Sequence, residues 1–424
     1  MRMRWCVLLL LATAARAEPL AITGAKVWTN LSATPVSRAT VVIDEGRIVS
    51  ITPEGPVPMQ ARVIDAAGQV ITPPLDAAAT QIGLVELDSA ADTDDRAVKS
   101  GPLGAAFDIS FGIDPNSLSI QFARAAGVAR ALVFPGPSGT GPFLGQAARL
   151  EIADAAHPLT RPRVALFVAS GGGASALAGG SRAAVWGVVR NALQEARALK
   201  QAPTPFRPRD QLQNHAEIEA LLPVLQRQVP LAVIANREAD IRQALALAHD
   251  FPLDLVILGA AEAWRVADGI AAARVPVILD PLDELPVSFD VLGARRDNAA
   301  RLARAGVRIA FSISGQGIYL SHDVGAALRE GAGVAAANGL PYEEALRAIT
   351  QSASLIWGDR EASGTLRAGG PADLVIWDGD PLEPSSAPLH VLSKGREISL
   401  QTRQTLLRDR YRPAAVTAPA VRTP

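Results

Sequence analysis

The sequence has few thiols and few lysines. Its 424 residues include a single cysteine, Cys6, and four lysines, so nearly all positive charge comes from arginine. One cysteine forms neither an internal disulfide nor a multi-cysteine zinc site, which excludes both kinds of scaffold. Basic and acidic residues almost balance, at a formal net charge of −1. Without a basic excess, we expect no nucleic-acid partner.

Long apolar runs are also missing. The amino terminus has a basic start, an apolar stretch from Trp5 to Ala12 and a small-residue site at residues 15–17. This pattern predicts a signal peptide over residues 1–17, cleaved before Glu18, and a periplasmic or secreted protein. The stretch is shorter than the roughly 20 residues that span a bilayer. We expect no membrane span, and a mature chain with no cysteine and a net charge of −4.

Residues 20–71 have the alternation of short β-strands. Apolar runs are interrupted at Glu45-Gly46 and Ala67-Gly68, which predict turns. The same alternation returns near the carboxyl terminus, in residues 372–380 and 389–400. We therefore expect a small β-sandwich built from both ends of the chain.

Between these parts the sequence alternates strand and helix patterns. Short apolar runs predict strands at residues 128–134, 164–169, 231–235, 255–259, 275–279 and 307–312, with one near residues 75–84 and a weaker eighth at 147–152. Amphipathic segments predict helices at residues 183–200, 215–228, 238–250, 298–306, 322–338 and 341–352. This order is typical of an α/β protein with parallel strands, and we predict a (β/α)8 TIM-like barrel.

The predicted domain boundaries follow from these changes of pattern. They are the signal peptide at 1–17, the two β-sandwich parts at 18–72 and 361–412, the barrel at 73–360 and a disordered Ala/Pro/Thr-rich tail at 413–424. A Pro-rich connection at 201–213 and two glycine-rich stretches at 135–146 and 170–182 are interpreted as loops.

Several segments together resemble the amidohydrolase superfamily, in particular its imidazolonepropionase-like secreted members. They are AITGAKVW, VVIDEGRIVSI, VIDAAGQVITPPLDA, GTLRAGGPADLVIWDGDPLE and LSKGRE, and they bracket nearly the whole mature chain. The resemblance implies the barrel described above and the hydrolysis of carbon–nitrogen bonds. It also implies a metal centre held by histidines at strand ends.

The sequence departs from that family at the implied metal ligands. The two histidines of the first barrel strand fall on Ala79 and Gln81, and those of later strands fall near Ile234 and Leu258. The resemblance places the last-strand aspartate at Ser314. The five histidines of the chain, at 157, 215, 249, 322 and 390, are expected in loops or helices without a metal-binding spacing. We therefore predict no bound cofactor, with a divalent cation on other residues left open.

Polar residues remain where barrel strands end, which is where barrels carry their chemistry. The candidate catalytic residues are Asp280 and Glu262, and the candidate ligand-binding residues are Gln81, Asn236, Arg237 and Ser314. Structural roles compete with these: Asp280 precedes a proline and suits a turn, and Glu262 suits a helix start. For Arg237 the hypothesis is a bidentate grip on a carboxylate.

Two functions stay open on the sequence. The first is an exported protein of the amidohydrolase fold that has lost its metal centre and binds a small carboxylate or peptide-like molecule at the barrel mouth. The second is an active hydrolase of amide bonds, including those of dipeptides, that uses a rebuilt or metal-free site. Whether the protein is an enzyme is therefore undecided, and so is homo-oligomer formation.

Overall fold

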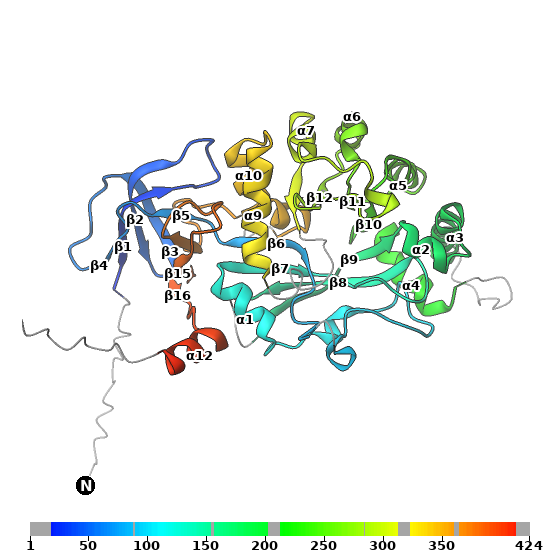
Figure 1. Cartoon of the computed structure of the whole chain (residues 1–424), viewed down its shortest axis with the longest axis horizontal. Helices are drawn as coiled ribbons and strands as arrows, with labels where there is room; N and C mark the ends of the chain where they lie inside the picture. The colour runs from blue at the N-terminus through cyan, green and yellow to red at the C-terminus, as the bar shows by residue number, and fades with distance from the viewer. Residues whose placement is uncertain are drawn as a thin grey trace, which may run out of the picture.

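The computed structural model describes residues 18–87, 90–153, 157–201, 213–283, 285–312, 323–359 and 364–412. The strands in these ranges form two eight-stranded sheets (Figure 1). One sheet lies at the left of the view, and the other forms the core of the helix-covered part at the right.

The first sheet joins the two ends of the chain. Its strand order is β16-β15-β14-β5-β1-β2-β3, and β4 pairs with β1. The bounds are β1 Leu20–Val27, β2 Val36–Asp44, β3 Arg47–Pro53, β4 Arg62–Asp65, β5 Val70–Thr72, β14 Leu374–Trp377, β15 Pro388–Ser393 and β16 Arg396–Glu397. Strand β14 is antiparallel to β5, with Val375 opposite Thr72. The predicted pairing of the two chain ends is therefore present, within one mixed sheet.

The turns of this sheet lie where the sequence predicts them. Glu45 and Gly46, between β2 and β3, both have positive φ (50° and 75°), which is the geometry of a tight hairpin turn. Gly68, between β4 and β5, has φ of 78°. The buried face of the sheet is aliphatic, and Ile22, Ile71 and Ile376 are fully buried in it.

The second sheet curls into a nearly closed barrel. Its order is β13-β12-β11-β10-β9-β8-β7-β6. The bounds are β6 Leu75–Thr80, β7 Val128–Val133, β8 Phe143–Glu151, β9 Leu159–Ala169, β10 Leu231–Ala235, β11 Leu255–Gly259, β12 Val277–Leu279 and β13 Ile309–Phe311. The two end strands, β13 and β6, lie close together. The Ser312 hydroxyl, directly after β13, donates to the Ala79 carbonyl in β6 at 2.7 Å.

The barrel departs from the predicted (β/α)8 pattern at β8. This strand is antiparallel to both β7 and β9, whereas the other neighbouring pairs are parallel. The connections before and after β8 are too short for the crossover of a dozen or more residues that parallel pairing requires. The predicted eighth strand at 147–152 thus exists, but it belongs to a meander. It also takes in the end of the glycine-rich stretch expected to be a loop.

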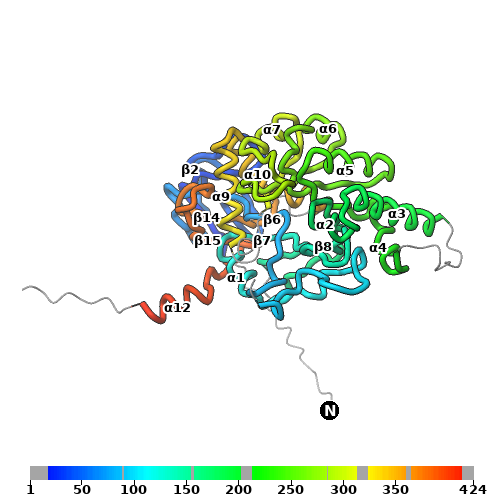
Figure 2. The backbone as a smooth tube through the Cα atoms, turned by 45° about the vertical axis from the view of Figure 1, so that its right-hand side comes forward, coloured from blue at the N-terminus to red at the C-terminus, as the bar shows by residue number. Residues whose placement is uncertain are grey.

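Helices cover the outside of the barrel (Figure 2). The α-helices are α1 Leu118–Ala125, α2 Gly172–Leu177, α3 Arg182–Gln201, α4 His215–Leu225, α5 Glu238–Asp250, α6 Ala267–Ala272, α7 Asn298–Arg304, α9 Val324–Ala337, α10 Tyr342–Thr350, α11 Ser352–Ile356 and α12 Arg403–Tyr411. Short 3-10 turns occur at η1 Ala91–Thr93, η2 Ile109–Gly112, η4 Ala263–Arg265 and η5 Phe289–Val291. Helix α2 replaces part of the loop expected at 170–182.

Three predicted segments lie wholly or mostly outside the described residues: the signal peptide, the Pro-rich connection and the tail. Within the described ranges, no helix combines the length and the apolar character needed to cross a membrane.

Candidate functional site

The polar residues predicted after β10 and β11 come together at the carboxyl end of the barrel. The Glu262 backbone N–H donates to the Asn236 carbonyl at 2.8 Å, which joins the two strand ends. The Glu262 carboxylate accepts from the backbone N–H of Glu238, the first residue of α5, at 2.8 Å. Glu262 therefore caps a helix start as the structural alternative supposes, although the helix is α5 and not its own.

Arg237 does hold a carboxylate, and this carboxylate belongs to the protein itself. Its Nε donates to Asp240 at 2.8 Å and lies 3.9 Å from Asp290. The hydrogen bond to Asp240 keeps the pKa of Arg237 above its ordinary value.

Asp290 lies at the centre of this arrangement, which we call the arginine clasp: Gly172, Arg182, Arg237 and Asp290. The Asp290 carboxylate accepts from the Gly172 backbone N–H at 2.7 Å and from the Arg182 guanidinium. The ring of Phe289 lies 5.7 Å from each of the two guanidinium groups. The loop after β12 thus places an acid between two arginines that follow β9 and β10.

Of the other predicted site residues, Gln81 and Asp280 accept hydrogen bonds from the protein itself, and Ser314 is not among the described residues. Gln81 is 3% exposed and accepts a long hydrogen bond of 3.4 Å from Arg96. Asp280 accepts from the Leu282 backbone N–H at 2.8 Å, which is the turn expected of Asp-Pro. Ser314 lies outside the described residues.

A small cavity at the ends of β11 and β12 joins the predicted Asp280 to charged and polar groups that the sequence patterns do not single out. Asp280 and Asp283 line it with Arg295, Arg296 and Asn298, and its volume is about 10 Å³, enough for about one water molecule. Burial raises the pKa of Asp283. The sequence signal for these groups is the Arg-Arg-Asp-Asn run at residues 295–298, whose Asn298 is the first residue of α7.

The backbone at this cavity is left-handed. Gly259 and Ala260 have φ of 81° and 56°, and alanine rarely adopts this conformation. A side chain at Gly259 would meet the Asn236 Oδ1 at 2.3 Å. The buried Asn298 amide donates to the Ala260 carbonyl at 2.9 Å, which holds the turn in place. Gly259 is therefore needed for the close approach of the β10 and β11 ends.

Apolar side chains fill the barrel interior below the mouth. One buried cluster contains Ala79, Phe134, Phe167, Leu258 and Trp357, and Ile234 packs against it. Phe134 and Phe167 stack at 5.0 Å between ring centroids, and the Trp357 ring is 6.3 Å from that of Phe167. The Trp357 Nε1 donates to the Ala78 carbonyl at 2.7 Å.

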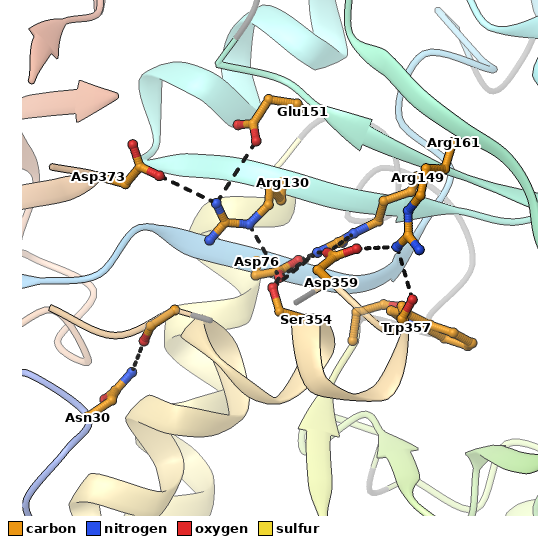
Figure 3. A network of polar contacts seen from close by, with 12 residues as sticks. Asn30, Asp76, Arg130, Arg149, Glu151, Arg161, Ser354, Trp357, Asp359 and Asp373 are labelled. Atoms are coloured by element: carbon orange, nitrogen blue, oxygen red, sulfur yellow. Dashed lines mark hydrogen bonds and ion pairs between the residues drawn. The ribbon is translucent and has the colours of Figure 1, made fainter. Parts of the chain in front are cut away.

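The amino-terminal end of the barrel contains buried charges (Figure 3). Asp76 on β6 is fully buried and receives two hydrogen bonds from Arg149 on β8, at 2.7 and 2.6 Å, and one from Ser354 at 2.6 Å. Arg149 also donates to Asp359 at 2.7 Å. Burial alone would raise the pKa of Asp76, but Arg149, together with Arg130 and Ser354, holds this pKa below its ordinary value.

Arg130 extends this network toward the first sheet. It lies 3.8 Å from Asp76, 4.0 Å from Glu151 and 3.8 Å from Asp373, which directly precedes β14 (Figure 3). Burial raises the pKa of Glu151 to about 7, although Arg130 acts in the opposite direction. Three carboxylates thus share one arginine where the two sheets meet.

This raised pKa predicts a pH-dependent stability. Because the folded protein binds the Glu151 proton more tightly than the unfolded chain, the free energy of unfolding should fall as pH rises from about 4.5 to about 7. We expect a loss of about 1–3 kcal/mol, reduced by the partial exposure of the side chain. Urea unfolding at several pH values should show this slope in the wild type and lose it in Glu151→Gln. An equal slope in both proteins would contradict the assignment.

Residues 238–401 match the amidohydrolase family. "Amidohydrolase tasK" of Hapsidospora irregularis is 40% identical over 57 residues, which are 13% of this chain and 6% of that protein. The chain thus spans a small part of this curated relative.

Solved structures agree on the fold. An amidohydrolase from Thermotoga maritima MSB8 superposes with a TM-score of 0.78 at 22% identity, over 90% of this chain and 99% of the other. A putative prolidase from Bifidobacterium longum gives 0.54 at 17% identity, over 93% and 100%. An adenosine deaminase from Xanthomonas campestris with bound zinc gives 0.53 at 17%, over 92% and 96%. The architecture is that of the amidohydrolase fold.

The positions to which the resemblance assigns metal ligands carry side chains without an imidazole or a carboxylate. The resemblance places ligands at Ala79 and Gln81 and near Ile234 and Leu258. Of these residues, Ala79, Ile234 and Leu258 lie in or against the apolar interior cluster. Shifting the first-strand register by one residue places Ala78 and Thr80 there instead, again without an imidazole. Within the described ranges, no group of three or more His, Cys, Asp or Glu side chains is arranged to hold a metal ion.

The histidines that the structure describes lie elsewhere. His215 and His249 are on helices, as expected, beside Glu219 and Asp250. His390 lies on β15, where its Nδ1 is 2.6 Å from Glu397, so the expected loop or helix position was wrong. His390 falls inside the strand pattern predicted at residues 389–400, so the expectation for this histidine conflicted with the strand prediction, and the strand prediction holds.

Proposed function

We propose that this protein is an exported, imidazolonepropionase-like member of the amidohydrolase superfamily that has lost the usual metal centre. In this proposal it binds a small carboxylate or peptide-like molecule at the barrel mouth. The β-sheet built from both chain ends completes the sandwich-and-barrel plan of that group, and residues 1–17 direct export. The amidohydrolase match and the shared fold support the family part of the proposal.

The loss of the metal centre is supported by what occupies its positions. Ala79, Ile234 and Leu258 carry no ligand atom, and they belong to or pack against the apolar cluster that contains Phe134 and Phe167. Gln81 offers only a neutral amide oxygen, better suited to hard cations than to zinc. We therefore derive no step of a reaction through a metal ion.

The ligand class follows from the arginine clasp, which is the observation that carries the proposal. The Arg182 guanidinium and the Gly172 backbone N–H already donate to the carboxylate of Asp290, and the Arg237 guanidinium lies 3.9 Å from it. Charge-assisted bonds of this type recognise carboxylates in general, so a ligand carboxylate has the same partners once Asp290 moves away. The Asp290 loop is suited to such exchange, because Phe289 and Val287 are 65% and 78% exposed.

The test is a thermal-shift and calorimetric screen of N-acyl amino acids and dipeptides. Wild-type protein should be stabilised by part of the panel, and Arg237→Ala should bind those ligands at least roughly tenfold more weakly. Asp290→Asn should bind them more tightly, because it removes the internal competitor and raises the binding-competent fraction. Arg190→Ala is the matched control, since Arg190 pairs with Asp250 on α5 at 2.6 Å.

Two results would overturn the proposal. One is unchanged ligand affinity in Arg237→Ala. The other is about one equivalent of zinc or manganese in protein purified without chelators, together with hydrolysis that a chelator abolishes. That second outcome would establish the active hydrolase instead.

A further inference from the structure

A second polar cavity lies on the outer wall of the barrel, apart from the arginine clasp. It is formed between α5, η4, α6 and α7, and has a volume of about 550 Å³. Helices α5, α6 and α7 are neighbours in Figures 1 and 2. This volume is in the range of small-molecule sites. We call it the arginine groove, and its charged lining residues are Arg242, Arg265, Arg301, Arg304 and Asp268.

Trp264 organises the arginine groove. Its Nε1 donates to the Gly293 carbonyl at 2.9 Å, and its backbone N–H donates to Asn298 at 3.1 Å, which fixes the ring. The guanidinium groups of Arg265, Arg295 and Arg301 lie 4.4, 4.9 and 5.6 Å from the ring centroid. Contacts of this kind hold cations in place without using their hydrogen-bond donors.

Several guanidinium N–H groups of the arginine groove have no acceptor among the described residues. Arg304 forms no hydrogen bond or ion pair with the part of the chain that the structure describes. Arg301 uses its Nε for Asp297 at 2.8 Å, and Arg265 approaches Glu262 only to 4.0 Å. Arg242 is 61% exposed and pairs with Glu238 on the same helix. The groove therefore presents guanidinium donors from three separate elements.

The geometry points to the arginine groove as a binding site for an oxyanion with two or more negative charges, of the phosphoryl class. Guanidinium forks match the oxygens of such anions and remain charged at all physiological pH values. A concave site that carries several arginines and one acid favours a compact, multiply charged anion over a monocarboxylate. Two sources supply this chemistry, a free oligophosphate and a phospholipid headgroup.

The test is calorimetry with sodium pyrophosphate and tripolyphosphate, and cosedimentation with vesicles containing phosphatidylglycerol. Wild-type protein should bind one equivalent of an oligophosphate, and Arg304→Gln should weaken binding roughly tenfold. Asp268→Asn should strengthen binding, because it removes the acid of the groove. Arg403→Gln on α12 is the control, since it makes the same charge change on an exposed residue elsewhere.

The results distinguish a free oligophosphate from a phospholipid headgroup, and both from a groove that binds neither. Binding to oligophosphate in solution, with the expected order of variants, supports a free ligand. Binding only to vesicles, with the same order, supports a headgroup. Absence of binding to both probes, or equal weakening by Arg304→Gln and Arg403→Gln, would overturn the proposal. Melting temperatures of the variants, measured alongside, should stay close to that of the wild type because these side chains are at the surface.

Discussion

Replacing Arg149 with methionine should lower the free energy of unfolding by about 3–5 kcal/mol, the range for breaking a buried ion pair. Asp76 is fully buried and receives two hydrogen bonds from Arg149. Without this guanidinium, its carboxylate keeps only the Ser354 hydroxyl and the more distant Arg130. The charge must then stay unpaired in the interior or take up a proton. Urea unfolding at pH 7 measures the loss.

Two controls define this prediction. Arg62→Met removes an exposed ion pair to Glu397, which is 4.0 Å long, and should cost less than about 1 kcal/mol. The double variant Asp76→Leu with Arg149→Met removes both buried charges and should recover part of the loss. A single-variant effect as small as that of Arg62→Met would show that the buried pair contributes little.

Replacing Trp357 with alanine should also be severe, at about 3–5 kcal/mol. The side chain is 3% exposed, packs near Phe167 and donates to the Ala78 carbonyl. Its removal leaves a cavity beside β6 and an unpaired carbonyl in a buried strand. Thermal unfolding followed by circular dichroism gives the change.

Trp357→Phe separates the two contributions. Phenylalanine keeps most of the packing but lacks the indole N–H, so this variant should lose about 1 kcal/mol for the hydrogen bond and somewhat more for the smaller ring. Equal losses in the alanine and phenylalanine variants would mean that the hydrogen bond, and not the packing, stabilises this end of the barrel.

The sequence predicts the helices and strands whose pattern of apolar and polar residues is contained in their own segment. Helix α5 begins and ends where the amphipathic pattern does, at Glu238 and Asp250, and β10 and β11 match their apolar runs. Strand β8 was predicted only weakly, and its direction was wrong. Direction depends on how long the connections are and on which neighbour a strand finds, and neither is contained in the alternation of its own residues.

The site was predictable by position but not by partner. Strand-end reasoning placed Asn236, Arg237 and Glu262 at one rim, where the structure has them. It did not identify Asp290 as the acid between Arg182 and Arg237, because the loop that carries it follows β12, two strands further along the barrel sheet. The sequence also does not indicate buried ion pairs such as Asp76 with Arg149, because only the fold brings these residues together.

The pairing of β14 with β5 has a consequence for how the chain reaches its final form. Thr72 leaves the ribosome long before its partner Val375, and the whole barrel is synthesised between them. Contacts of such long sequence separation form slowly, because the closure of a large loop must come first. Until residues 374–377 arrive, β5 has an open edge that is prone to wrong association. Completion of the first sheet is therefore a late step in biogenesis, and a premature stop before Leu374 leaves this edge unprotected.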